Sequence, residues 1–287
     1  MARKLLALVS VCALILGLWA FWLEPASLKN ESHEIVLSSW PALCDGIRVA
    51  VLADLHVGSP YNGVDKLRQI VDLTLAAKPD LILLAGDYVV ARVLGGEFIQ
   101  PEVITRALSR LSAPLGVFAV LGNHDRSHNA RQIESAFAMV GIPVLEDAAV
   151  AAVSGQCSFW IVGLSDFWEG PRDYSNAFAK LPPGAPALAL THNPDVFPLV
   201  PERVSLTFAG HTHGGQVYLP IFGRLIVPSR YGQRYAIGHI VEHGRHMFVS
   251  PGLGTSILPV RFLVPPEVSV VTIRSAIPRQ KDHRKAI

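Results

Sequence analysis

Short apolar runs of β-strand length recur along this chain and alternate with segments of helical pattern. The runs lie at Ile47–Ala53, Leu81–Ala85, Val117–Leu121, Phe159–Leu164, Ala187–Thr191 and Leu206–Ala209. Helices are predicted at Gly63–Ala77, Pro101–Leu111 and Asn129–Met139. This alternation indicates an α/β domain. The later part is rich in Gly and Pro and looks antiparallel, so we expect two packed sheets, with further strands at Gln216–Leu219, Tyr235–Val241, His246–Val249 and Val268–Ile273.

Polar clusters follow five of these runs. They are Asp54-Leu55-His56, Gly86-Asp87, Gly122-Asn123-His124-Asp125, His192 and Gly210-His211-Thr212-His213-Gly214-Gly215. Each cluster alone is a weak signal, because Asp, Asn and Gly are also common turn residues. Strand ends on one side of a sheet converge, however, so together the clusters bring two carboxylates, one amide and four imidazoles to one place. That set exceeds one tetrahedral ion and fits two divalent cations that share a carboxylate, a site that attracts phosphate.

Charge and cysteine content exclude other classes of function. The chain has 25 Lys and Arg against 23 Asp and Glu, so it lacks the basic footprint of a nucleic-acid binder and no nucleic-acid partner is expected. Cys12, Cys44 and Cys157 are too few and too scattered for a disulfide framework or a thiolate zinc site. Cys44 and Cys157 are the pair that could join, and we do not expect that bond. Ser165-Asp166 lacks the flanking elbow of a serine nucleophile.

The N-terminus has the pattern of a membrane helix. Leu5 to Leu23 carries no charge, and its 19 residues can span a bilayer core. A cleaved signal peptide is the alternative, but its apolar region is normally shorter, and no small-x-small cleavage site precedes Glu24. We therefore expect an uncleaved anchor.

The charges around this segment predict its orientation. Arg3 and Lys4 precede it and acidic residues outnumber basic ones after it, so the N-terminus is expected in the cytoplasm. A single-pass protein of the inner membrane follows, with its main domain on the outer or periplasmic side. The cytoplasmic face is the alternative, because a basic C-terminal run could contact anionic lipid; it comprises Arg279, Lys281, Arg284 and Lys285.

The order of the motifs DLH, GD, GNHD, His192 and GHTHGG resembles the calcineurin-like metallophosphoesterases over about Gly46 to Arg274. GHTHGGQV at Gly210–Val217 and SPGLGTSILPVRF at Ser250–Phe262 resemble a bacterial membrane-associated branch of the YkuE and YaeI type, and also the branch that contains a UDP-diacylglucosamine pyrophosphatase. The resemblance implies a four-layer αββα sandwich in which two mixed sheets pack face to face. The expected organisation is an anchor (1–24), a linker and lead-in (25–45), the metallophosphoesterase domain (46–274) and a basic tail (275–287).

The resemblance also implies a role for each site residue. Asp54, His56 and His213 would bind a first metal, Asn123, His192 and His211 a second, and Asp87 would bridge both. His124 would stabilise the transition state or protonate the leaving oxygen, with Asp125 positioning it. Ala53 replaces the Ser most often found before Asp54, which removes no ligand.

The expected metals are Mn, Zn or Fe. Purple acid phosphatases, a sister class, use a tyrosine three residues after the bridging Asp, and that position is Val90 here. Tyr88 would point to the opposite face of a continuing strand. We therefore expect no tyrosinate iron site.

The expected function is hydrolysis of a phosphodiester or pyrophosphate bond in a cell-envelope or lipid-linked substrate. A tethered phosphoesterase for a soluble small molecule, or a metal-binding scaffold without turnover, are the alternatives. The loop with Trp168, Glu169, Arg172 and Tyr174 could line a substrate pocket or be an ordinary surface loop. Of the apolar residues in 218–222 and 225–227, at least half are expected in core strands.

Overall fold

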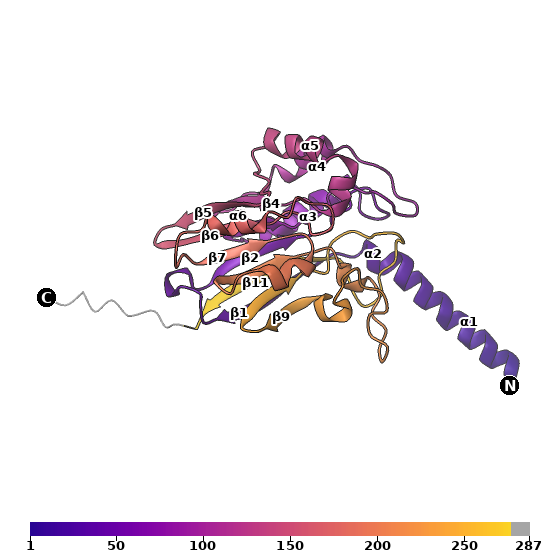
Figure 1. Cartoon of the computed structure of the whole chain (residues 1–287). Helices are drawn as coiled ribbons and strands as arrows, with labels where there is room; N and C mark the ends of the chain where they lie inside the picture. The colour runs from indigo at the N-terminus through magenta and orange to yellow at the C-terminus, as the bar shows by residue number, and fades with distance from the viewer. Residues whose placement is uncertain (277–287) are drawn as a thin grey trace.

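The computed structural model describes residues 1–276 and contains two mixed β-sheets (Figure 1). The first sheet has the order β1 (Lys29–Leu37), β11 (Glu267–Ser275), β2 (Ile47–Leu52), β3 (Leu81–Leu84) and β4 (Val117–Ala119). The second has the order β5 (Ala148–Ser154), β6 (Cys157–Gly163), β7 (Ala187–Leu190), β8 (Val204–Ala209), β10 (Arg245–Val249) and β9 (Gly238–Glu242). Strands β2, β3 and β4 are mutually parallel, as are β6, β7 and β8, so each set ends at one edge.

The main core lies between the two sheets. Successive side chains of a strand point to opposite faces, and β2 follows this rule. Val49 and Val51 belong to the cluster between the sheets, whereas Ala50 and Leu52 belong to the cluster under the helices. Both faces of β2 are therefore apolar from Val49 to Leu52, which explains the hydrophobic run there. Arg48, near the start of the strand, is partly exposed.

Helices cover the outer face of each sheet. Helices α3 (Val64–Ala76), α4 (Pro101–Leu108) and α5 (Asn123–Met139) pack on the first sheet, where α4 begins with a proline at its first position. Helix α6 (Tyr174–Ala179) and the 3-10 helix η3 (Pro194–Leu199) pack on the second. The predicted four-layer αββα sandwich is confirmed.

Several elements differ from their sequence-based predictions. Helix α5 begins at Asn123, six residues before the predicted start, with a kink at Asn129. Asp125 accounts for the early start, because its Oδ2 accepts a hydrogen bond from the backbone N of Gly122, 3.0 Å away, at the helix N-terminus. Helix α6 was not predicted at all. Its six residues are too short for a clear helical period.

Two edge strands and one pairing also differ. Strand β1 lies within the range expected to be linker, yet it pairs in parallel with β11. Its polar residues lie on an exposed edge, where the chain need not be apolar. Strand β5, rich in Ala, forms the other missed edge. The later half is only partly antiparallel: β9 pairs antiparallel with β10, but β10 pairs in parallel with β8. Gln216–Leu219 forms isolated bridges rather than a strand.

The N-terminal helix projects from the domain (Figure 1). Helix α1 (Ala2–Leu18), the π-helical turn η1 (Trp19–Leu23) and α2 (Glu24–Ala26) follow one another without a break. Within residues 1–276 this is the one helix long and apolar enough to cross a membrane, and α1 buries none of its residues. The basic residues of the predicted tail, Arg279, Lys281, Arg284 and Lys285, lie outside the described residues.

Buried polar contacts fix the base of this helix to the domain. Glu24 is buried, and its carboxylate accepts hydrogen bonds from the backbone N of Val264 and from Nε1 of Trp19. The backbone N of Arg261 donates to the carbonyl of Ala20 across 2.9 Å. These bonds set the direction in which the apolar helix leaves the domain.

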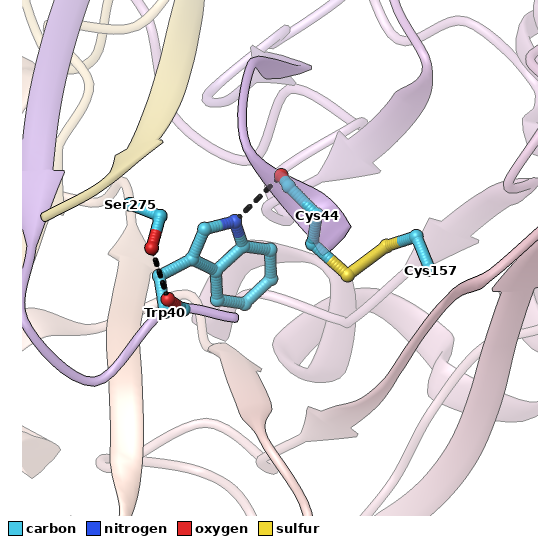
Figure 2. Close-up of a disulfide and its surroundings, with 4 residues drawn as sticks. All are labelled: Trp40, Cys44, Cys157 and Ser275. Atoms are coloured by element: carbon cyan, nitrogen blue, oxygen red, sulfur yellow. Dashed lines mark hydrogen bonds between the residues drawn. A yellow bond between two sulfur atoms is a disulfide. The ribbon is translucent and has the colours of Figure 1, made fainter. Parts of the chain in front are cut away.

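A disulfide joins Cys44 to Cys157, against our expectation (Figure 2). Cys44 ends the 3-10 helix η2 (Ala42–Cys44), which leads into the first sheet, and Cys157 begins β6 of the second. Trp40 lies beside the disulfide. Its Nε1 donates to the carbonyl of Cys44, and its own carbonyl accepts from Oγ of Ser275 (Figure 2). The bond thus ties the two sheets together across a sequence separation of 113 residues.

Candidate metal centre

The predicted ligands come together where parallel strands end. Asp54 and His56 follow β2, Asp87 follows β3, Asn123 follows β4, His192 follows β7, and His211 and His213 follow β8. Two groups of potential ligands that share no residue form there. Within each group, all the ligand atoms lie within 4.8 Å of one another. One group is Asp54, His56 and His213, and the other is Asp87, His192 and His211. Asn123 adjoins the second group, with its Oδ1 3.2 Å from Nε2 of His192.

Asp87 lies between the two groups. Its Oδ2 is 3.5 Å from Nε2 of His56 and 3.3 Å from Nε2 of His192. Its Oδ1 accepts a hydrogen bond from the backbone N of His124 across 2.9 Å, which holds the carboxylate in place. One carboxylate oxygen therefore faces ligands of both groups.

Hydrogen bonds to backbone carbonyls orient two of the imidazoles. Nδ1 of His192 lies 2.8 Å from the carbonyl of Ala85, and Nδ1 of His56 lies 3.2 Å from the carbonyl of Val89. A carbonyl only accepts, so Nδ1 carries the proton and Nε2 presents a lone pair. Nε2 of His56 faces Nε2 of His213 at 3.2 Å, beside the Asp54 carboxylate. Lone pairs that converge in this way fit divalent cations.

Burial and charge favour the protonation states that metal ligands need. Burial lowers the pKa of His56 to about 4 and holds those of His211 and His213 well below their usual value, so these rings are neutral. Burial raises the pKa of Asp87, but the charges of nearby histidines, His192 foremost, outweigh it and keep that pKa well below normal.

Two further groups of the site have a raised pKa. Burial lowers the pKa of His192, yet the carboxylate of Asp87 outweighs this effect and raises the pKa to about 10. Burial raises the pKa of Asp54 to about 7. A proton at these places neutralises charge that a bound cation would neutralise, which again fits the ligand set to divalent metals.

The ligands lie on an unusual backbone. Five of them have a positive φ of 38–72°, the left-handed region that residues other than Gly rarely adopt: Asp54, His56, Asp87, His211 and His213. Such conformations persist where the surrounding fold enforces them, and they cluster at functional sites. The strands thus turn sharply at their ends, which directs consecutive side chains into one space.

Glycines permit the close approach of these turns. An added Cβ at Gly122 would lie 2.1 Å from Oδ1 of Asp87, and one at Gly252 would lie 2.8 Å from Cβ of Asp54. One at Gly210 would lie 2.8 Å from Oδ2 of Asp54. The carboxylates of Asp54 and Asp87 therefore pack directly against glycine backbone, where any other residue would clash.

His124 forms a third group of potential ligand atoms with His56 and Asp87, and this group overlaps the other two. Its side chain is partly exposed, and its Nε2 is 3.9 Å from Oδ2 of Asp87. Nδ1 of His124 is buried without a hydrogen-bond partner among the described residues. The ring is thus close enough to Asp87 to serve as a metal ligand or to act on a molecule bound beside it.

Asp125 acts on the backbone near His124 and not on its imidazole ring. The carboxylate of Asp125 binds backbone amides instead of the imidazole, accepting hydrogen bonds from N of Asp87 and Tyr88 at 2.8 Å and from N of Gly122 at 3.0 Å. Burial raises its pKa to about 7, and the charge of Asp87 adds to that rise. Asp125 therefore fixes the turn after β3 to the start of α5, and it positions His124 and Asp87 through the backbone.

A cavity of about 390 Å³ opens over the ligands. Of the four loop residues that could line a substrate pocket, Trp168 lines this cavity, with its ring edge-on to His211 at 4.3 Å between centroids. Tyr174 is buried instead, where its hydroxyl donates to the carbonyl of Ser165. Glu169 and Arg172 are not among the lining residues. Sequence reasoning did not assign Arg92, Gln216, Ile226 or Ile257 to the cavity. No motif marks Arg92 or Ile226, and the motifs that contain Gln216 and Ile257 indicated a family branch and not a role.

The tyrosine after Asp87 points away from the ligands, as predicted. Tyr88 is buried under the helices, and its hydroxyl donates to the carbonyls of Leu84 and Val120. Burial raises its pKa well above the usual value, which disfavours a tyrosinate. Val90 stands at the position of the iron-binding tyrosine.

This fold and these converging ligands define a metal-dependent α/β hydrolase. A family model described as calcineurin-like phosphoesterase matches residues 47–215, and the chain belongs to that family. The resemblance seen in the motifs is thereby confirmed, including its bacterial branches. The protein is a metallophosphoesterase, of a family that binds divalent metals.

Three relatives match along most of their length. A metallophosphoesterase of Bacillus subtilis, YkuE, is 30% identical over 90% of this chain and 89% of its own. The phosphodiesterase YaeI of Escherichia coli is 32% identical over 79% and 82%. The UDP-2,3-diacylglucosamine pyrophosphatase LpxG of Chlamydia trachomatis is 26% identical over 88% and 91%. A fourth relative, from Danio rerio, is named as a transmembrane protein with a metallophosphoesterase domain, and the apolar N-terminal helix likewise suggests that this chain associates with a membrane.

Proposed function

We propose that this protein hydrolyses a phosphodiester or pyrophosphate bond in a lipid-linked or cell-envelope molecule, with two divalent cations drawn from Mn, Zn or Fe. The observation that carries the proposal is the position of Asp87, whose Oδ2 faces His56 at 3.5 Å and His192 at 3.3 Å. Such cations, when bound, polarise a phosphoryl group and activate water for attack on phosphorus.

Each ligand has a proposed place. Asp54, His56 and His213 hold one cation, Asn123, His192 and His211 hold the other, and Asp87 contacts both. Their hydrogen bonds to backbone groups keep them in position before substrate arrives, so little reorganisation accompanies the reaction.

His124 is the proposed catalytic residue outside the ligand set. It lines the cavity, its buried Nδ1 has no hydrogen-bond partner among the described residues, and its Nε2 lies 3.9 Å from Oδ2 of Asp87. It either donates a proton to the leaving oxygen or stabilises charge on the phosphoryl group. The hydrogen bond from its backbone N to Asp87 couples its position to that of the bridging carboxylate.

The cavity lining favours a substrate with both anionic and apolar parts. Arg92 offers a cation to a phosphate beside the ligands, while Ile226 and Ile257 line the same cavity. The name of the relative LpxG describes a substrate with a pyrophosphate and two acyl groups, which is the same combination. A water-soluble phosphate ester is the alternative, and the polar lining residues Gln216 and Ser256 favour it.

The outer or periplasmic side of the inner membrane is the proposed location of the domain. Disulfides form and persist in oxidising compartments and are rare in the cytosol, so the Cys44–Cys157 bond supports this side. Arg3 and Lys4 before the apolar helix support it independently. The cytoplasmic face is the alternative, and reduced thiols at both positions in intact cells would favour it.

A substrate screen tests the function. The purified full chain, loaded with Mn or Zn, is assayed against phosphomonoesters, a chromogenic phosphodiester, nucleotide-sugar pyrophosphates and lipid pyrophosphates. Asp87→Asn should lose activity, and Asp65→Asn, an exposed carboxylate on α3, is the matched control. Hydrolysis of none of these substrates, or equal activity of the two variants, would refute the proposal. Activity confined to water-soluble esters would favour the alternative substrate class.

A further inference from the structure

Large aliphatic side chains are exposed around the mouth of the metal cavity. Ile221 is 99% exposed, Ile226 79%, Ile257 72% and Phe222 68%. None of the apolar residues in 218–222 and 225–227 is buried, which contradicts the expectation that at least half of them lie in core strands. Together with Leu94 and Leu225, these four exposed side chains form a surface that we call the apolar rim. A contiguous exposed apolar surface of this kind marks an interaction site.

Backbone hydrogen bonds join the three loops that carry the rim. Ile257 exchanges them with the loop of Leu94: its N donates to the carbonyl of Arg92 and its carbonyl accepts from N of Leu94. N of Tyr218 donates to the carbonyl of Phe262, which brings the loop of residues 217–226 to the segment that follows Ile257. The three loops are therefore fixed to one another, and the apolar rim is one surface.

An apolar groove connects the rim with the metal cavity. The groove has a volume of about 310 Å³, and Leu225, Leu258 and Val260 line it. Ile226 and Ile257 line both the groove and the metal cavity. An extended hydrocarbon chain can thus lie in the groove while a group attached to it lies over the metal ligands.

The rim lies beside the apolar N-terminal helix. The segment that follows Ile257 binds the end of that helix directly, through Arg261 to Ala20 and Val264 to Glu24. Figure 1 shows a loop, orange on the colour scale, that projects from the domain on the side where α1 leaves it. Trp19 and Trp22 of the helix are exposed near this junction, and tryptophans favour the membrane interface.

We propose that the apolar rim inserts into the surface of the bilayer that the N-terminal helix enters, so that the metal cavity opens toward the lipid. The groove then takes an acyl chain directly from the membrane. Two arginines lie at the polar border of the rim and suit anionic headgroups: Arg92 at the cavity, and Arg224, whose guanidinium lies over the ring of Tyr218. Insertion of the rim is independent of catalysis, whereas the acyl-chain role of the groove rests on the proposed function.

Depth measurements on the full chain in liposomes test the insertion. In a Cys12→Ser background, Phe222→Cys carries an environment-sensitive dye, and Val153→Cys on β5, also an exposed apolar position, is the control. The liposomes contain phosphatidylcholine and phosphatidylglycerol. We expect the dye at 222 to shift to the blue and to be quenched by nitroxide lipids, and the dye at 153 to keep its aqueous spectrum. Aqueous spectra at both positions would overturn the proposal.

Charge substitutions test the same surface without a dye. Ile221→Glu should slow hydrolysis of a lipid pyrophosphate in liposomes about tenfold, because a carboxylate replaces a membrane-inserted side chain, and should leave hydrolysis of a soluble chromogenic ester unchanged. Val153→Glu should affect neither. Equal rates of Ile221→Glu and Val153→Glu on the lipid would refute the role of the rim. A protein that hydrolyses no substrate but shows dye insertion would refute the proposed function alone.

Discussion

Gly122→Ala should disable the metal centre through a single methyl group. The new Cβ would lie 2.1 Å from Oδ1 of Asp87 and 2.7 Å from Cγ of the same side chain. Contacts under 3.0 Å are essentially never observed, so the carboxylate must move by about 0.9 Å or the turn must open. The φ of Gly122 is −92°, which alanine adopts freely, so steric overlap with Asp87 is the sole cause of the expected loss.

The expected size of the effect on activity follows from the displacement of the Asp87 carboxylate. A misplacement of about 1 Å costs on the order of a hundredfold in rate where the geometry of the site is decisive. Overpacking of a tight site adds a loss of about 1–3 kcal/mol in the free energy of unfolding. We therefore expect roughly a hundredfold lower kcat, a reduced metal content and a modestly lower melting temperature.

Gly63→Ala is the matched control. Gly63 is the N-cap of α3 as Gly122 is of α5, with nearly the same backbone, φ −81° and ψ −173° against φ −92° and ψ 176°. A Cβ at Gly63 meets nothing within 4 Å. The assays are elemental analysis and hydrolysis of a chromogenic phosphodiester. If Gly122→Ala and Gly63→Ala had equal metal content and equal rates, the position of the Asp87 carboxylate would not determine metal binding or activity.

Four more tests probe the metal centre and the disulfide. His124→Ala should keep both metals but lose a hundredfold to ten-thousandfold in rate on substrates with poor leaving groups, and much less on nitrophenyl esters; loss of a metal by elemental analysis would make His124 a ligand. Asp87→Asn should lose more activity and more metal than Asp54→Asn, since only the former faces both groups; identical losses would count against bridging. Chelation should lower the melting temperature measured by calorimetry, and added Mn or Zn should restore it, because ligands that bind only the folded state stabilise it. Replacing Cys44 and Cys157 by serine should lower the unfolding free energy by about 4–5 kcal/mol, given the 113-residue separation, and urea titration measures it; unchanged stability would mean that the bond constrains little.

The central strands and the ligand set could be predicted because their signals are local. Strands such as β2 and β3 are buried on both faces, so apart from Arg48 in β2 they consist of apolar residues, and the ligands follow directly where those runs end. Edge strands lack that signal. Strand β1 is polar because only its last residues, such as Ile35 and Leu37, reach the core.

Other features depend on contacts that local sequence does not encode. Cys44 and Cys157 are 113 residues apart, and only the packing of the two sheets brings them together. Asp125 was expected to hold an imidazole, but the turn after β3 offers it several amides at once. Hydropathy also cannot separate a core strand from an exposed loop, so at least half of the apolar residues around Ile221 and Phe222 were expected in the core, whereas both of these side chains are exposed.

The positive φ values of the metal-ligand residues imply a conflict between the stability of the protein and its activity. Each non-Gly residue held at positive φ costs about 1–3 kcal/mol, and five of the seven ligands are held in this way. Glycine adopts that conformation without strain, so a substitution such as His213→Gly would relieve strain while removing a ligand. Selection for heat resistance alone would therefore erode the centre one residue at a time. An engineer who wants a more robust variant should choose sites such as the surface of α3 and leave the strand ends of β2, β3 and β8 alone.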